Sequence, residues 1–132
     1  MRFALIPLVL LAHATAFAAP VYRCTGSIGN DVVIVLVNAV APNQFEARTT
    51  VTNSTGTALD SGVVPVKHFV NPDGGPSLWV NGAADYSLLV YEEQLGLGGK
   101  VESLDVTGGF IDVATGVFQV FDRAVLGCTV RR

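Results

Sequence analysis

Cys24 and Cys128 are the only cysteines of the 132-residue chain, and they stand near its two ends. A redox pair more often shows a C-x-x-C spacing, and a zinc site needs more ligands. Two distant cysteines on apolar faces of an exported chain are typical of a structural disulfide. We therefore predict a Cys24–Cys128 disulfide that closes nearly the whole domain into one loop. In the chain-entropy model, a loop of this length contributes up to roughly 4.7 kcal/mol.

His68 is the one histidine that remains once the expected export signal is removed. A Ser–His–Asp triad would need a nucleophile such as the serine of a G-x-S-x-G turn, and the sequence has no such turn. Glu92 and Glu93 would point to opposite faces of a strand, and turns beside Asp112 and Asp122 explain why these two interrupt apolar faces. The carboxylates are otherwise scattered: Asp31, Glu46, Asp60, Asp73, Asp85, Glu102 and Asp105. We predict no catalytic residues and no enzyme.

The glycine-rich stretch from Gly96 to Lys100 invites a phosphate-loop interpretation. That interpretation fails because Val101 stands where Ser or Thr is required, and a strand is expected to follow instead of a helix. No EF-hand calcium loop is present, and histidine and cysteine are too few for a zinc site. The sequence therefore predicts neither a metal site nor a cofactor.

Four aromatic residues lie within one third of the chain, around the Pro-Gly loop at residues 71–76, and His68 stands beside them. They are Phe69, Trp79, Tyr86 and Tyr91. Such residues either pack in the core or form a binding surface beside the loop, because Trp and Tyr are favoured at recognition sites. Together with His68 they are the candidate binding surface.

The first 18 residues have the pattern of a cleavable secretory signal. Arg2 precedes an apolar run of about ten residues, which is too short to cross a bilayer, and Ala16–Ala18 supply an A-x-A exit. We predict cleavage after Ala18, export to the periplasm or the extracellular space, and a single domain at 19–132. No second apolar segment is long enough to span a membrane.

The charge balance excludes some partners. Without Arg2 the chain has seven basic side chains against eleven acidic ones, a net charge near −4. Nucleic acids and anionic membranes both attract basic surfaces, so neither is expected as a partner. Charged residues make up 14% of the chain, against roughly 25% in typical domains.

Short segments with strand patterns follow one another along the domain. They cover residues 22–28, 32–40, 45–52, 63–70, 78–80, 101–106, 110–113, 117–121 and 124–130. The segment at 32–37 is apolar on both faces, as in a strand covered on each side or one whose outer face meets a partner. Pro65 predicts an edge or bulged strand. Asn53 begins an N-x-T triplet that matters only in a eukaryotic secretory route.

Residues 84–95 fit two structures. Read as a strand, the segment points Tyr86, Leu88 and Val90 inward, whereas Ala84, Leu88, Tyr91 and Leu95 form a helical stripe. The helix would place two glutamates at its negative end, so we favour the strand.

About eight strands at regular spacing predict an antiparallel β-barrel, with a β-sandwich as the alternative. A disulfide between the first and last strands favours the barrel, because those strands are neighbours when a barrel closes.

We expect a non-enzymatic exported module that binds a protein or an envelope or surface glycan. The alternatives are a carrier that holds an apolar small molecule inside the barrel and, with least support, a hydrolase that uses His68 with a nearby carboxylate. The sequence shows no motif of a known family.

Overall fold

The structure is a computed structural model that describes residues 19–73, 75–81, 87–97 and 100–130. These residues form nine strands and no α-helix. The strands are β1 (Ala19–Ile28), β2 (Asp31–Ala41), β3 (Gln44–Thr52), β4 (Ala58–Asp60), β5 (Val64–Phe69), β6 (Leu78–Asn81), β7 (Ser87–Leu95), β8 (Val101–Ile111) and β9 (Phe118–Val130).

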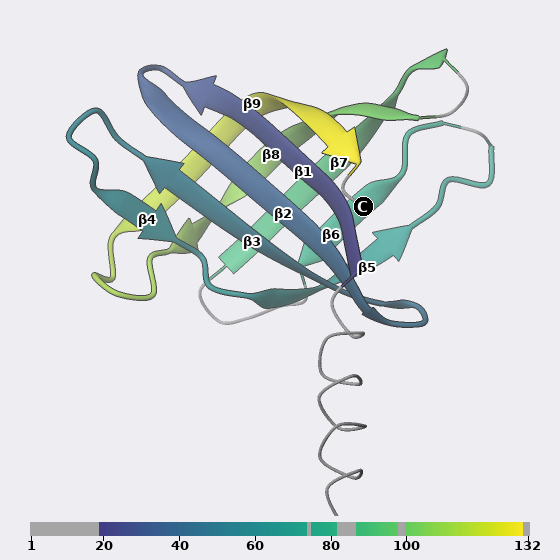
Figure 1. The fold of residues 1–132 in the computed structure, drawn as a ribbon, viewed down its shortest axis with the longest axis horizontal. Coiled ribbons are helices and arrows are strands. Elements are labelled where there is room, and N and C mark those ends of the chain that lie inside the picture. Colours follow the sequence, from purple (N-terminus) through teal and green to yellow (C-terminus); the bar gives the residue numbers. More distant parts are fainter. Residues whose placement is uncertain (1–18, 74, 82–86, 98–99, 131–132) are drawn as a thin grey trace, which may run out of the picture.

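Eight of these strands close into an antiparallel barrel, and β4 lies outside the closed ring (Figure 1). The order around the barrel is β1, β9, β8, β7, β6, β5, β3 and β2, and β2 pairs again with β1. The barrel prediction is therefore confirmed, and the sandwich and the helix at 84–95 are not found in the part that the structure describes.

The disulfide joins Cys24 to Cys128, which lie directly opposite each other in the β1–β9 ladder. That ladder has four register pairs, from Tyr22 to Thr25 on β1, whereas β1 and β2 pair along almost their whole length. Figure 1 shows the purple first strand beside the yellow last strand. The disulfide thus lies within the short seam at which the chain closes on itself.

Side chains fill the barrel interior, as expected for an eight-stranded barrel. The fully buried residues come from most of the strands and include Val33, Val35, Val37, Thr49, Trp79, Leu89, Tyr91, Leu104, Val106, Phe110 and Leu126. Most of them are aliphatic or aromatic, so the interior is a packed apolar core with a few polar groups.

The β8–β9 turn is tied to β4 by one carboxylate. Asp112 accepts hydrogen bonds from the backbone N–H of Asp60 at 2.6 Å and from the backbone and side chain of Thr115. The backbone N–H of Val113 donates to the carbonyl of Asp60 at 3.0 Å. Asp112, which interrupts an apolar pattern in the sequence, is therefore the group that fastens this turn against β4.

Expectations about three strands are wrong in whole or in part. In β7 it is Leu89 that points inward, whereas Leu88 is 58% exposed. In β2 the alternate residues of the apolar run face outward and Val32 is 48% exposed, so the strand is not covered on both sides; an outer face that meets a partner stays a prediction. Pro65 lies in β5, which pairs with β3 on one side and with β6 on the other, so β5 is not an edge strand.

Candidate functional site

A pocket of about 400 Å³ lies on the barrel wall where the β2–β3 turn meets β5. Its lining residues are Val40, Asn43, Gln44, Phe45, Glu46, Val63, Pro65, Val66 and Lys67. The backbone of Asn43 has a φ of +59°, a left-handed conformation that asparagine tolerates better than most residues. The pocket thus combines apolar walls with two amides, a carboxylate and an ammonium group.

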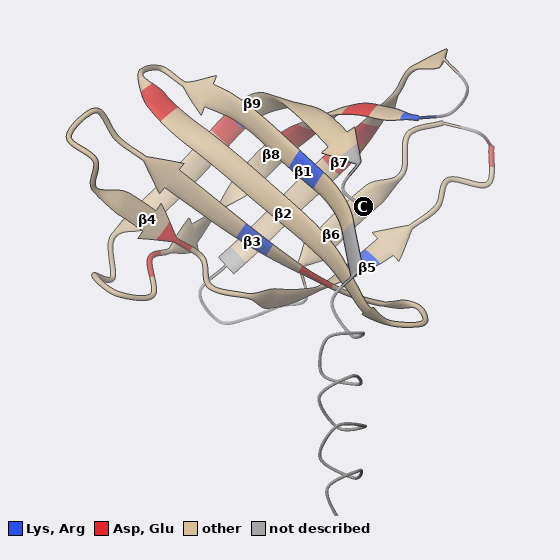
Figure 2. Ribbon diagram, viewed as in Figure 1, with Lys and Arg blue, Asp and Glu red and all other residues tan. Residues whose placement is uncertain are grey.

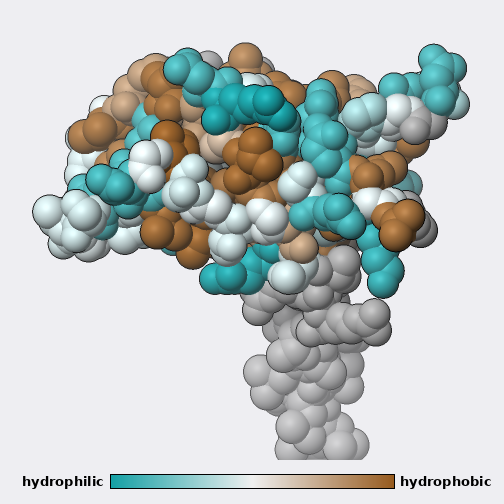
Figure 3. All heavy atoms as spheres, turned by 90° about the horizontal axis from the view of Figure 1, so that it is seen from above, coloured by the Kyte–Doolittle hydropathy of each residue, from teal (hydrophilic) through white to brown (hydrophobic). Residues whose placement is uncertain are grey.

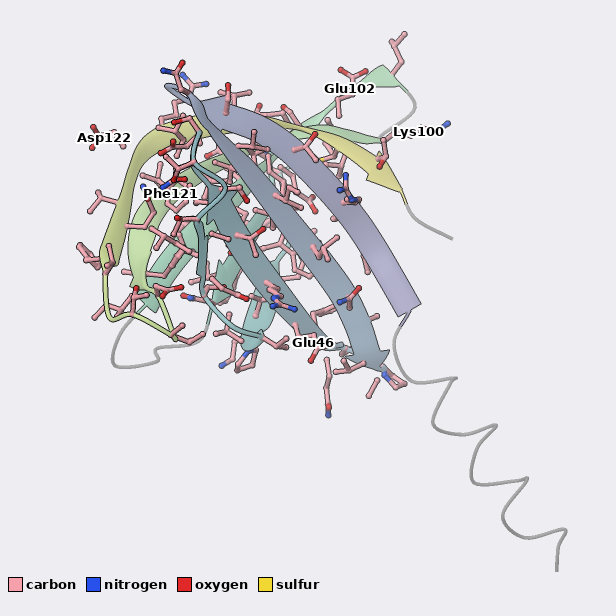
Figure 4. The ribbon with its side chains drawn as sticks, turned by 60° about the vertical axis from the view of Figure 1, so that its left-hand side comes forward. Glu46, Lys100, Glu102, Phe121 and Asp122 are labelled. Atoms are coloured by element: carbon pink, nitrogen blue, oxygen red, sulfur yellow. A yellow bond between two sulfur atoms is a disulfide. The ribbon has the colours of Figure 1, made fainter. Side chains whose placement is uncertain are left out.

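The β-ladders explain how these polar groups come together. Glu46 lies opposite Asn38 on β2 and opposite Pro65 on β5, so it stands at the centre of three strands. Figure 4 shows Glu46 at the end of the barrel that is remote from Asp122. The carboxylate is therefore flanked by strands on both sides.

Phe45 connects the pocket to a buried cluster at the same end of the barrel. Its ring meets the ring of Trp79 edge-on, with centroids 4.8 Å apart. Trp79 is 2% exposed, and its indole Nε1 donates a hydrogen bond to the carboxylate of Glu93, which is 4% exposed. The hydroxyl of Tyr22 donates to the same oxygen at 3.2 Å. The wall of the pocket is thus held in place by a buried carboxylate and its donors.

His68 covers the other side of this cluster. Its ring stacks on Trp79 with centroids 4.0 Å apart, and Nε2 lies 3.3 Å from Oε1 of Glu93. Nε2 is buried and is outside hydrogen-bonding geometry with that oxygen. A nearby carboxylate is one condition for a catalytic histidine, but no described hydroxyl is hydrogen-bonded to His68. The arrangement holds the aromatic rings together.

The hydroxyl groups of Tyr22 and Tyr91 both have hydrogen-bond partners, as their burial requires. Burial, together with the charge and the hydrogen bond of Glu93, raises the pKa of Tyr22 to about 12. Burial also raises the pKa of Tyr91, although the hydroxyl of this residue lies 2.7 Å from Oγ1 of Thr49. Both phenols are therefore neutral hydrogen-bonding groups at physiological pH.

The residues of the predicted binding surface do not lie together on one surface of the structure. Trp79 and Tyr91 face the interior, His68 is partly buried, and Phe69 is exposed at the end of β5. Tyr86 lies outside the described residues. His68 and Trp79 are the members of the predicted set that stack on each other.

Glu93 and the pocket residues were missing from that set. The available signal was the alternation of β7, which places Glu93 on the same face as Leu89 and Tyr91. In the described ranges, no cluster of His, Cys, Asp and Glu is suited to a metal ion, and no helix is long and apolar enough to cross a membrane.

Comparison with known proteins gives no relative. No protein-family model, no curated protein and no solved structure matches the chain.

Proposed function

We propose that the chain is an exported, non-enzymatic binding module that holds a glycan in the β3–β5 pocket. The observation that supports this proposal is the composition of the pocket. Gln44 and Asn43 offer amide donors and acceptors, Glu46 offers an acceptor and Lys67 a donor, beside the apolar surface of Pro65. Sugars need this combination, because their hydroxyl groups both donate and accept while their ring carbons pack on apolar surface.

The packed interior makes a carrier the weaker alternative. Large side chains such as Trp79, Tyr91, Phe110 and Leu104 are fully buried in the barrel, in the volume that an apolar ligand would need. The pocket instead lies on the wall, where a ligand can enter without displacing the core.

The test uses the exported protein with a panel of neutral and charged oligosaccharides, followed by calorimetric titration of those that bind. We expect Glu46→Gln to weaken binding by about tenfold, the usual effect of losing a hydrogen bond to a charged group. Glu102→Gln removes an equal charge on a hairpin far from the pocket (Figure 4) and should leave binding unchanged.

Two outcomes would contradict the glycan proposal. One is that no oligosaccharide binds at millimolar concentration. The other is that Glu46→Gln and Glu102→Gln behave alike. If a protein bound through the pocket residues instead, the chain would still be a binding module, but its ligand would not be a glycan.

A further inference from the structure

A second surface, on the opposite side of the barrel from the pocket, carries apolar and acidic side chains that the glycan site does not use. We call it the β7–β9 face and define it by Leu88, Glu92, Asp105, Phe118, Val120 and Asp122. Figure 4 shows Asp122 pointing away from the barrel, on the side opposite Glu46. Figure 2 shows acidic residues along β7, β8 and β9.

The apolar part of this face is centred on a glycine. Leu88 and Val120 both lie opposite Gly109 in the ladders, and they are 58% and 51% exposed. Phe118 is 61% exposed, and its ring lies 3.1 Å from the point where a side chain on Gly109 would begin. Figure 3 shows that hydrophobic residues reach the surface beside hydrophilic ones. Adjacent exposed apolar side chains of this kind mark interaction sites.

The acidic part lies further along the same strands, beyond the Val90–Thr107 pair. Glu92 and Asp105 lie directly opposite each other on β7 and β8, an arrangement in which like charges repel. Arg123 contacts Oδ2 of Asp105 at 2.6 Å and 2.8 Å, and the amide of Gln94 donates to Glu92 at 2.8 Å. In these contacts one cation, Arg123, faces two carboxylates, so the pair keeps a net negative charge.

The two carboxylate oxygens of Asp105 differ in their contacts, because Arg123 pairs with Oδ2 alone. The residue is 9% exposed, and its Oδ1 is buried without a hydrogen-bond partner among the described residues. A buried carboxylate oxygen without a donor is unfavourable, because it has lost its hydration. A guanidinium or ammonium group beside Glu92 would offset the repulsion between the two carboxylates.

We infer that the β7–β9 face docks a basic, amphipathic segment of a partner protein. An arginine or lysine of that segment lies between Glu92 and Asp105, and its apolar side chains pack on Leu88 and Val120. A second copy of this chain is disfavoured as the occupant, because it would bring the same carboxylates, including Asp122, against this acidic surface. An anionic lipid surface is disfavoured for the same reason.

The test probe is a synthetic peptide of alternating leucine and arginine, titrated into the exported protein and followed by amide chemical shifts. We expect shifts on β7–β9 and affinity that falls as salt rises. Glu92→Gln and Val120→Ser should each weaken binding by about tenfold. The matched controls are Asp73→Asn, which removes an equal charge, and Val32→Ser on β2, which removes an apolar side chain that is 48% exposed, against 51% for Val120.

Each result that differs from these expectations contradicts a specific part of the docking proposal. Equal losses in the variants and their controls would show nonspecific attraction and overturn the proposal. So would equal binding of a leucine–glutamate peptide, the absence of binding, or shifts at the pocket. Dimerisation through this face, detected by sedimentation and abolished by Val120→Ser, would replace the partner protein with a second copy. None of these outcomes affects the oligosaccharide titrations, which report on the pocket alone.

Discussion

The indole N–H of Trp79 donates a hydrogen bond to the buried carboxylate of Glu93, 14 residues along the chain. The two residues lie on the neighbouring strands β6 and β7 and both point into the barrel. Trp79 also contacts His68 and Phe45 through its ring. The pair therefore links the inside of the barrel to the wall of the candidate pocket.

Trp79→Phe should destabilise the protein while it keeps most of the apolar ring. The substitution removes one donor from a carboxylate that remains buried, and we expect a loss of about 2–3 kcal/mol in the free energy of unfolding. Urea denaturation followed by circular dichroism measures it. Tyr22→Phe removes the other donor to Glu93 from a less buried position and should cost less. A larger loss in Tyr22→Phe than in Trp79→Phe would show that the indole is not the principal donor.

The barrel could be predicted from the sequence for two reasons. The alternation of each strand can be read within that strand alone, and Cys24 and Cys128 fall on the first and last strands. The faces of β7 could not be predicted, since Leu88, Leu89, Val90 and Tyr91 are apolar on both sides and period two does not distinguish inside from outside. In the structure, β7 pairs with β6 and β8, and this pairing buries Leu89 and leaves Leu88 exposed.

The candidate site was harder to predict than the fold. Tyr22, His68, Trp79 and Glu93 come from four different strands, and their meeting depends on the barrel order. A buried glutamate also runs against the usual preference of charged residues for the surface. The pocket is likewise formed by a turn and a strand whose proximity follows from the pairing of β3 with β5.

Loss of the disulfide should destabilise the domain strongly. Cys24 and Cys128 close a separation of 104 residues, so the double variant Cys24→Ala/Cys128→Ala should lose about 2–5 kcal/mol. Urea denaturation of both proteins, with and without reductant, measures the effect. Reductant should shift the unfolding midpoint of the wild type and leave that of the variant unchanged. Equal midpoints for oxidised wild type and variant would show that the bond adds no stability to the β1–β9 seam.

Gly108 should not tolerate a side chain. Its φ is +105°, and a Cβ there would lie 2.0 Å from the carbonyl oxygen of Leu88. Gly108→Ala should therefore lower the free energy of unfolding by more than about 2 kcal/mol. Gly127 is the matched control, because it has no positive φ and a Cβ there would meet nothing within 4 Å. Equal thermal midpoints for Gly108→Ala and Gly127→Ala would contradict the close approach of Gly108 to the backbone of Leu88.

Acid should loosen the junction of β4 with the β8–β9 turn. Hydrogen bonds from Thr115 and from the backbone of Asp60 lower the pKa of Asp112, and the hydrogen bond from Arg48 lowers that of Asp60. Both carboxyl groups thus bind protons less readily in the folded chain than in the unfolded chain, where the pKa is about 3.9. Their contribution to stability is complete above about pH 5 and is lost as the pH falls through the folded values.

Asp112→Asn tests this pH dependence. The variant should be less stable than wild type at neutral pH, because one ionised acceptor of several hydrogen bonds is gone. It should also lose less of its stability between about pH 5 and pH 2, because that carboxyl no longer takes up a proton on unfolding. Urea midpoints across this range measure both effects, and Asp73→Asn, in an exposed loop, is the control. A variant that parallels wild type down to acid pH would show that Asp112 holds the turn without its charge.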